Sequence, residues 1–180
     1  MNFNYMYELP FGAGKSFLTS GMLSKILGDW SLSGFTSWYS GDPLTLEPEF
    51  NNTGGVVSAL RVNAVPGVDP HPAKRGPAMW FNPAAFAHPG DFEIGNVPRT
   101  HPTLTNPIYQ NHDLAITKRV PLSSEKSIEL LFQSFNFINH ANWTDPDTEI
   151  GPANAPNANA GRIIGSRGGR VLQLGARYNF

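Results

Sequence analysis

The chain has 180 residues with 13 basic and 14 acidic side chains, a formal net charge of −1, and no cysteine. It lacks the basic excess that dominates nucleic-acid binding, so we expect no nucleic-acid partner. The lack of cysteine excludes disulfide scaffolds and cysteine-based zinc or redox sites. With 18 Gly, 16 Pro, 12% aromatic and only 15% charged residues, the composition disfavours both a helical bundle and a disordered chain. It predicts a β-rich protein with long loops.

The sequence has neither of the usual signs of helical membrane insertion. No apolar run approaches the ~18 residues of a transmembrane helix, and the N-terminus MNFNYMYELP lacks the basic and apolar regions of a signal peptide. Both features are typical of a soluble protein. A membrane β-barrel strand, however, needs only about 10 residues of alternating character, which hydropathy averages miss.

The first predicted strand covers residues 2–9, where apolar and polar side chains alternate. An aromatic or leucine side chain occupies every odd position from Phe3 to Leu9, whereas the even positions are polar except for Met6. This period of two indicates a strand with one apolar face. After a break, residues 21–28 are compatible with a short helical turn.

The second predicted strand, residues 30–40, carries Trp30 and Trp38 on one face. Along a strand that rises ~3.3 Å per residue, the two indoles are about 26 Å apart. Barrel strands tilt by ~40°, which converts this distance to about 20 Å of height, near the ~25 Å apolar band of an outer-membrane barrel. Aromatic girdles flank that band, so we expect Trp30 and Trp38 to be membrane-interface aromatics. The alternative is a pair of core tryptophans in a soluble β-sandwich.

Residues 41–112 contain most of the prolines and show little periodicity. We expect them to form an irregular loop far longer than an ordinary connection in a compact domain. Alternation returns in residues 113–120 and 127–138, which a short polar connection joins. Lys118 falls on the apolar face of the first of these strands, where a lysine can snorkel to an interface. After Phe132 the phase of alternation changes, which predicts a bulge or a departure from the sheet.

A second long, irregular loop is expected over residues 139–169, and the chain ends on its clearest strand, residues 171–180. One parity of this strand is entirely apolar: Leu172, Leu174, Ala176, Tyr178 and Phe180. The connections between the five strands therefore alternate between shorter and longer. A meander through a membrane produces this asymmetry, with short turns on one side and long loops on the other. Five strands cannot close a barrel, and lipid does not tolerate open sheet edges, so a membrane protein of this kind needs further strands.

Several segments of the chain carry a family resemblance. They are YELPFGAGKSFL (7–18), GDWSLSGFTSWYSGDPLTL (28–46), WFNPAAF (80–86), LLFQSFNFINHANW (130–143) and the last strand, ending in Phe180. In this order, over nearly the whole chain, they resemble the C-terminal part of TonB-dependent receptors, most closely the Oar-like subgroup common in acidobacteria. The resemblance implies an all-β fold over residues 1–180: antiparallel strands from the C-terminal part of a transmembrane outer-membrane β-barrel, with long irregular loops.

The resemblance also implies a function and partners. We expect part of a Gram-negative outer-membrane transporter or receptor that takes up a large or scarce substrate; the alternative is a soluble or secreted β-sandwich that binds a ligand. The expected partners are outer-membrane lipid, the remainder of the barrel with its plug domain, the TonB complex and the barrel-assembly machinery. The family's plug lies N-terminal to the barrel, so we expect the chain to be a fragment of a longer protein. Leu172, Leu174, Ala176, Tyr178 and Phe180 match the family's barrel-assembly signal.

Other motifs do not predict catalysis, and we expect no enzyme, cofactor or metal site. The sequence from Gly12 to Ser16 (GAGKS) resembles a phosphate-binding loop, but the first glycine of that motif is replaced by Leu9. The five histidines lack the spacings that place two metal ligands on one element. The acidic segment TDPDTE (144–149) lacks the glycine and the distant glutamate of a calcium loop.

Overall fold

The computed structural model describes residues 1–55 and 60–180, which divide into two compact units. The first, which we call the strand unit, consists of Met1–Tyr39, Tyr109–Ala141 and Gly168–Phe180. The second, the loop unit, consists of Ser40–Ile108 and Asn142–Arg167. The segments that the sequence predicts as long loops thus gather into one unit. None of the helices among the described residues has the length and apolar character needed to cross a membrane.

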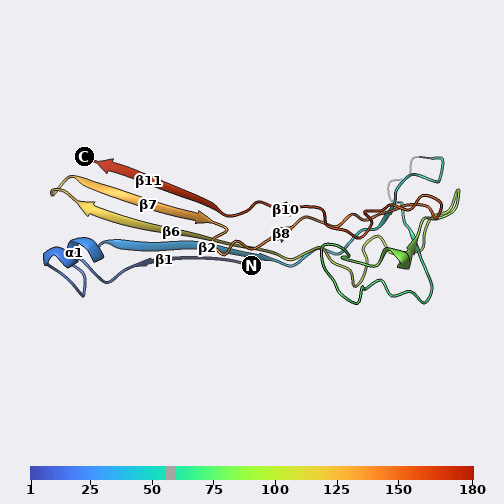
Figure 1. Ribbon diagram of the computed structural model, residues 1–180, viewed down its shortest axis with the longest axis horizontal. Coiled ribbons are helices and arrows are strands. Elements are labelled where there is room, and N and C mark those ends of the chain that lie inside the picture. The colour runs from blue at the N-terminus through green and yellow to red at the C-terminus, as the bar shows by residue number, and fades with distance from the viewer. Residues whose placement is uncertain (56–59) are drawn as a thin grey trace. The chain divides into compact units, whose positions relative to one another are not determined.

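The strand unit is built on a five-stranded antiparallel sheet (Figure 1). The sheet order is β1-β2-β6-β7-β11, with β1 at Asn2–Glu8, β2 at Trp30–Tyr39, β6 at Tyr109–Pro121, β7 at Ser127–Phe135 and β11 at Val171–Asn179. The predicted all-β, antiparallel fold class is confirmed. Strand β6 begins before the predicted range because Tyr109 already pairs with Tyr39 at the end of β2.

Strand β7 ends earlier than its sequence pattern suggests. Its pairing with β11 runs without a bulge to Phe135, after which Asn136 and Asn139 adopt positive φ angles of 50° and 56°. Asparagine tolerates this left-handed conformation better than most residues. The change of phase after Phe132 therefore marks a departure from the sheet, which is one of the two predicted possibilities.

The strand register aligns the apolar parities of all five strands on one face of the sheet. Tyr7 pairs with Leu32, Leu32 with Ile116, Ile116 with Phe132, and Phe132 with Leu174. Directly opposite residues of antiparallel strands share a face, so this row crosses the whole sheet. The opposite parity forms a mainly polar face, one row of which is Met6, Ser33, Ala115, Gln133 and Gln173. We call these two surfaces the apolar face and the polar face.

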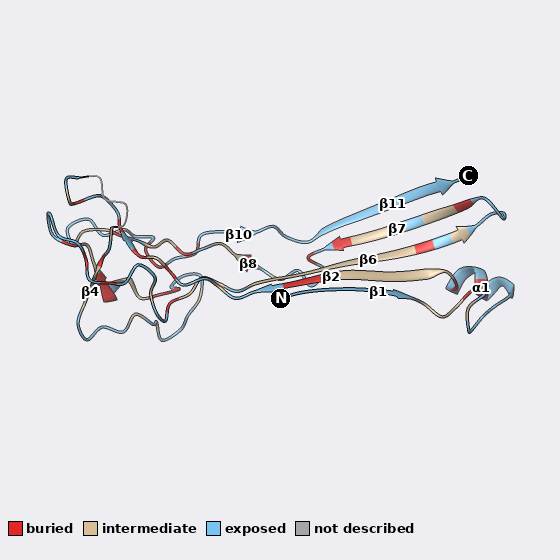
Figure 2. Ribbon diagram, turned by 180° about the vertical axis from the view of Figure 1, so that it is seen from behind, coloured by how far each residue is buried: buried red, intermediate tan, exposed pale blue. Residues whose placement is uncertain are grey.

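No second sheet of comparable size exists among the described residues. Every residue of the edge strands β1 and β11 is exposed, and Leu174 of the apolar face is 84% exposed (Figure 2). The remaining strand pairs have two residues per strand: β3 (Glu47–Pro48) with β9 (Glu149–Ile150), β4 (Asn63–Ala64) with β5 (Phe86–Ala87), and β8 (Asn142–Trp143) with β10 (Ser166–Arg167). A soluble β-sandwich would cover the apolar face with a second sheet.

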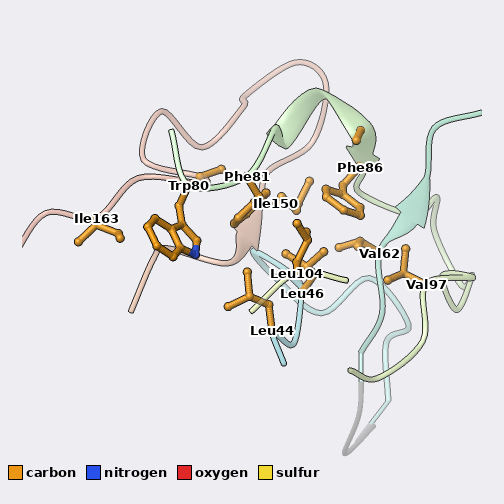
Figure 3. Close-up of a cluster of buried hydrophobic side chains, with 12 residues drawn as sticks. Leu44, Leu46, Val62, Trp80, Phe81, Phe86, Val97, Leu104, Ile150 and Ile163 are labelled. Carbon is orange, nitrogen blue, oxygen red and sulfur yellow. The ribbon is translucent and has the colours of Figure 1, made fainter. Parts of the chain in front are cut away.

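The loop unit has its own hydrophobic core, although it contains little regular structure (Figure 3). The buried side chains are Leu44, Leu46, Val62, Trp80, Phe81, Ala85, Phe86, Val97, Leu104, Ile150, Ala160 and Ile163. The last three come from the second long connection and the others from the first. The parallel pairing of β3 with β9 also joins the two connections. The two connections therefore fold together around one core and are not two independent irregular loops.

Trp80 and Phe81 lie where the two connections meet. The Trp80 ring contacts that of Trp143 edge-on at 5.8 Å, and its Nε1 donates to the Thr105 carbonyl at 2.7 Å. The backbone N–H of Trp80 donates to Gly161 O at 2.6 Å. Gly161 has φ of +76°, and a Cβ there would lie 2.6 Å from the carbonyl oxygen of Phe81. Glycine is required at this crossing for both reasons.

Two short helical elements complete the fold. The 3₁₀ helix η1 (Pro83–Ala85) follows Asn82, whose side chain accepts from the Ala84 N–H in the loop unit. In the strand unit, helix α1 (Gly21–Leu27) falls within the predicted helical turn. It ends at Gly28, whose N–H donates to Ser24 O at 2.8 Å. The chain's C-terminus lies at the same end of the sheet as α1 (Figure 1).

Candidate functional site

Trp30, the first residue of β2, anchors helix α1 to the sheet. Its Nε1 donates to the carbonyl of Ile26 at 2.9 Å. The Lys118 ammonium lies 5.6 Å from the centre of the Trp30 ring, within the range of a cation–π contact. Trp30 and Lys118 are directly opposite in the register, on the apolar face. The aromatic side chain at this end of β2 is therefore bound to the connection that precedes it.

Lys118 is a cation in the mainly apolar part of this face, and it is only 5% exposed. Its ammonium donates to the carbonyls of Lys25, at 2.9 Å, and Gly28. These are among the last carbonyls of α1, which have no partner within the helix, and a cation stabilises the negative end of the helix dipole. The helix end thus provides partners for the ammonium beside the sheet, and a position of Lys118 at a membrane interface stays a prediction.

Trp38 lies near the other end of β2 and is 44% exposed. Its Nε1 donates to the side chain of Gln110 at 3.0 Å, and its ring contacts that of His112 edge-on at 5.4 Å. Thr36 and His112 form a further side-chain hydrogen bond of 3.0 Å. The apolar face thus gives way to polar groups around Trp38. Amphipathic aromatics at both ends of β2 match the predicted girdle positions, and their interface role stays a prediction.

The predicted assembly-signal residues lie together on β11. Leu172, Leu174, Ala176 and Tyr178 point to the apolar face, where they are paired with residues of β7. The ring of Phe180 stacks on that of Tyr178 with centroids 5.8 Å apart. Strand β11 is at the edge of the sheet, so one of its sides is open to strand addition.

The polar face carries a row of alternating charge near the short-turn end of the sheet. Arg119 is opposite Glu129, and Glu129 is opposite Arg177 with an N–O separation of 4.0 Å. A hollow of about 480 Å³ near this row is also lined by Glu8 and Lys15, which form an ion pair. Lys15 belongs to the GAGKS segment, which therefore forms a salt-bridged turn beside β1.

The histidines and acidic side chains of the loop unit have structural roles. His101 Nδ1 accepts from the N–H groups of Leu104 and Thr103 at 3.1 and 3.3 Å. Burial, with a smaller contribution from His71, lowers the pKa of His101 and so favours the neutral form that can accept these bonds. Among the described residues, no cluster of three or more His, Asp or Glu side chains could hold a metal ion.

The acidic TDPDTE segment also makes internal contacts. Asp147 Oδ1 accepts from the N–H of Glu149 at 3.0 Å and from the Asn157 amide at 3.2 Å. Asp145 lies 3.7 Å from an Arg167 guanidinium nitrogen. These bonds hold the second long connection in its folded form.

Residues 1–173 match a protein family described as the outer membrane beta barrel domain. The chain belongs to this family. Neither the curated proteins nor the solved structures contain a match. The protein is therefore located in the outer membrane. That the apolar face of its sheet is turned toward lipid, as in other outer-membrane barrels, stays a prediction. The alternative prediction of a soluble or secreted β-sandwich is therefore wrong.

Sequence reasoning missed the group formed by Lys118, Trp30 and helix α1. The signals were present as a lysine on an apolar strand face and as the stretch MLSKIL within the predicted helical turn. Neither signal alone reveals that the lysine binds the helix, because the two are 90 or more residues apart in the sequence.

Proposed function

We propose that this outer-membrane barrel segment belongs to a TonB-dependent receptor of the Oar-like type, which takes up a large or scarce substrate. The observation that carries the proposal is the common core of the two long connections, formed by residues such as Phe81 and Ile150. Loops that only joined strands would not need a shared core. A folded surface of this kind is suited to capturing a ligand before it enters the barrel.

The strand register shows that both long connections leave the sheet at the same end. Tyr39 and Tyr109, which bound the first connection, are directly paired, as are Phe135 and Val171 at the second. In outer-membrane barrels the longer loops are extracellular and the short turns periplasmic. The loop unit would therefore be extracellular, where a receptor meets its substrate.

We also propose two partners for this barrel segment, a plug domain and the TonB complex. The polar face, including Arg119, Glu129 and Arg177, would line the barrel interior and meet a plug domain supplied by the full-length protein. Transport of a substrate against its gradient would need energy from the inner membrane through the TonB complex. The family resemblance of segments such as 130–143 supports these assignments.

Two experiments test this proposal: reading the gene sequence upstream of the Met1 codon, and a TonB-binding assay. The reading frame upstream of the Met1 codon should continue through more alternating strands to a plug domain and a TonB box. The full-length protein should bind the purified periplasmic domain of TonB from the same organism, and deletion of the TonB box should abolish binding. A stop codon and promoter directly before Met1, or TonB binding unaffected by the deletion, would contradict the proposal.

We also propose that β11 acts as the signal read by the barrel-assembly machinery. An open strand edge can be captured by strand addition, while Leu174, Tyr178 and Phe180 give side-chain specificity. Deletion of Phe180 from the full-length protein should reduce the amount of assembled barrel far more than Trp30→Leu, measured by heat-modifiable migration of outer-membrane fractions. Equally mild effects would leave Phe180 only an anchoring role at the interface.

A further inference from the structure

A hollow of about 400 Å³ lies between the apolar face and the connection that contains α1. Phe11, Leu18 and Leu27 line it from the connection, and Trp30, Leu32 and Ile116 from the sheet. Ser31 is its single polar lining residue. We propose that this hollow binds an acyl chain of a phospholipid from the periplasmic leaflet. The inference rests on the outer-membrane location and on short turns being periplasmic, and is independent of the TonB assignment.

The hollow is continuous with the lipid-facing surface. Leu32 and Ile116 belong to the row of paired apolar residues that crosses the sheet from Tyr7 to Leu174. Hydrocarbon that covers this row would reach the hollow without crossing a polar surface. The volume of about 400 Å³ falls within the ~300–1,000 Å³ range of small-molecule sites, which are also mostly apolar.

Helix α1 exposes apolar side chains that a periplasmic turn in water would have no reason to carry. Met22, Leu23, Ile26 and Leu27 are 79%, 59%, 56% and 46% exposed. A contiguous apolar surface of this kind marks an interaction site, and short amphipathic segments of this composition bury their apolar side chains at a membrane interface. Lys25, exposed in the last turn, places a cation where an anionic lipid phosphate would lie.

Hydrogen bonds to backbone carbonyls at the end of α1 also suit this end of the helix to contact with hydrocarbon. Carbonyl groups without partners are costly in lipid, and three carbonyls at or just after the end of this helix accept from side chains of the sheet. The Trp30 indole binds Ile26 O, and the Lys118 ammonium binds the carbonyls of Lys25 and Gly28. These bonds explain a buried lysine on a lipid-facing surface, and they hold the helix against the sheet so that the hollow is preformed.

Photo-crosslinking tests the proposal. The full-length protein would be reconstituted in vesicles of phosphatidylethanolamine and phosphatidylglycerol containing a phospholipid with a diazirine in its acyl chain. After irradiation, we expect labelled peptides from residues 9–29 at levels at least equal to those from Leu172–Leu174 of β11. The polar turn Ser123–Lys126 reports background. Labelling of residues 9–29 at background level would overturn the proposal, and this readout needs no variant.

Two substitutions on the same helix separate the hollow from general membrane contact. Leu27 lines the hollow, whereas Met22 does not. We expect Leu27→Gln to reduce labelling of residues 9–29 several-fold and Met22→Gln to leave it within about twofold, while labelling of β11 confirms that both variants fold. Equal losses would show adsorption of the helix to the interface without a bound chain, and would refute the proposal.

Discussion

Truncation of Phe81 to alanine tests whether the two long connections fold as one unit. The Phe81 side chain is 0% exposed, contacts the Phe86 ring edge-on at 5.9 Å, and clusters with Ile150 of the second connection (Figure 3). Removing a fully buried phenyl ring from a core costs about 3–5 kcal/mol. If opening is fast relative to cleavage, this cost raises the open population of the loop unit by about 10²- to 4 × 10³-fold.

The readout is tryptic cleavage after Arg162, which lies in the second connection, far from residue 81 in the sequence. Its backbone is protected in the folded state, because its N–H donates to Asn159 O and its carbonyl accepts from the Asp147 N–H. We expect Phe81→Ala in the reconstituted barrel to accelerate this cleavage strongly. Phe92→Ala is the matched control, since Phe92 lies in the first connection but is 80% exposed. Faster cleavage confined to Arg99 of the first connection would refute a common core.

Two further predictions concern the buried Lys118 and the half-buried His101. Lys118→Met removes the donors to Lys25 O and Gly28 O, so we expect a loss of about 1–3 kcal/mol in urea unfolding of the barrel and faster cleavage after Lys25; unchanged cleavage would contradict the anchoring role. Because the folded state lowers the pKa of His101, its contribution to stability is complete above the unfolded value of ~6.5 and is lost as pH falls through the folded pKa. Thermal unfolding of the loop unit from pH 7.5 to 5 should show this loss in the wild type and less of it in His101→Asn, and identical pH profiles would count against it.

The sheet was predictable because its signals are local. Alternation in each strand assigns every residue to one of two faces, and the pairing of Leu32 with Ile116 and of Ile116 with Phe132 only joins faces already defined. The order of connection lengths further predicts that both long loops lie on one side of the membrane and the shorter turns on the other. The end of β7 was less clear, because the turn at Asn136 depends on backbone angles that the apolar residues beyond it do not reveal.

The loop unit was not predictable in the same way. Its core residues, such as Leu44, Val62 and Leu104, occur without a period of two or of 3.6, so no pattern distinguishes them from exposed residues. Their burial depends on contacts with Ile150, more than 40 positions away from the nearest of them. Lys118 is a similar case, because its position on an apolar face is explained only by the end of helix α1.

The direction of the edge strands limits how the barrel can close. Each strand is antiparallel to its neighbour in the order β1-β2-β6-β7-β11, so β1 and β11 run in the same direction. A ring made only of copies of this sheet would place β11 parallel to β1 of the next copy at every junction. Bacterial outer-membrane barrels are antiparallel throughout, with an even number of strands and at least eight. Closure therefore requires an odd number of further strands between β11 and β1, and at least three, because only an odd insertion makes both junctions antiparallel and the total even.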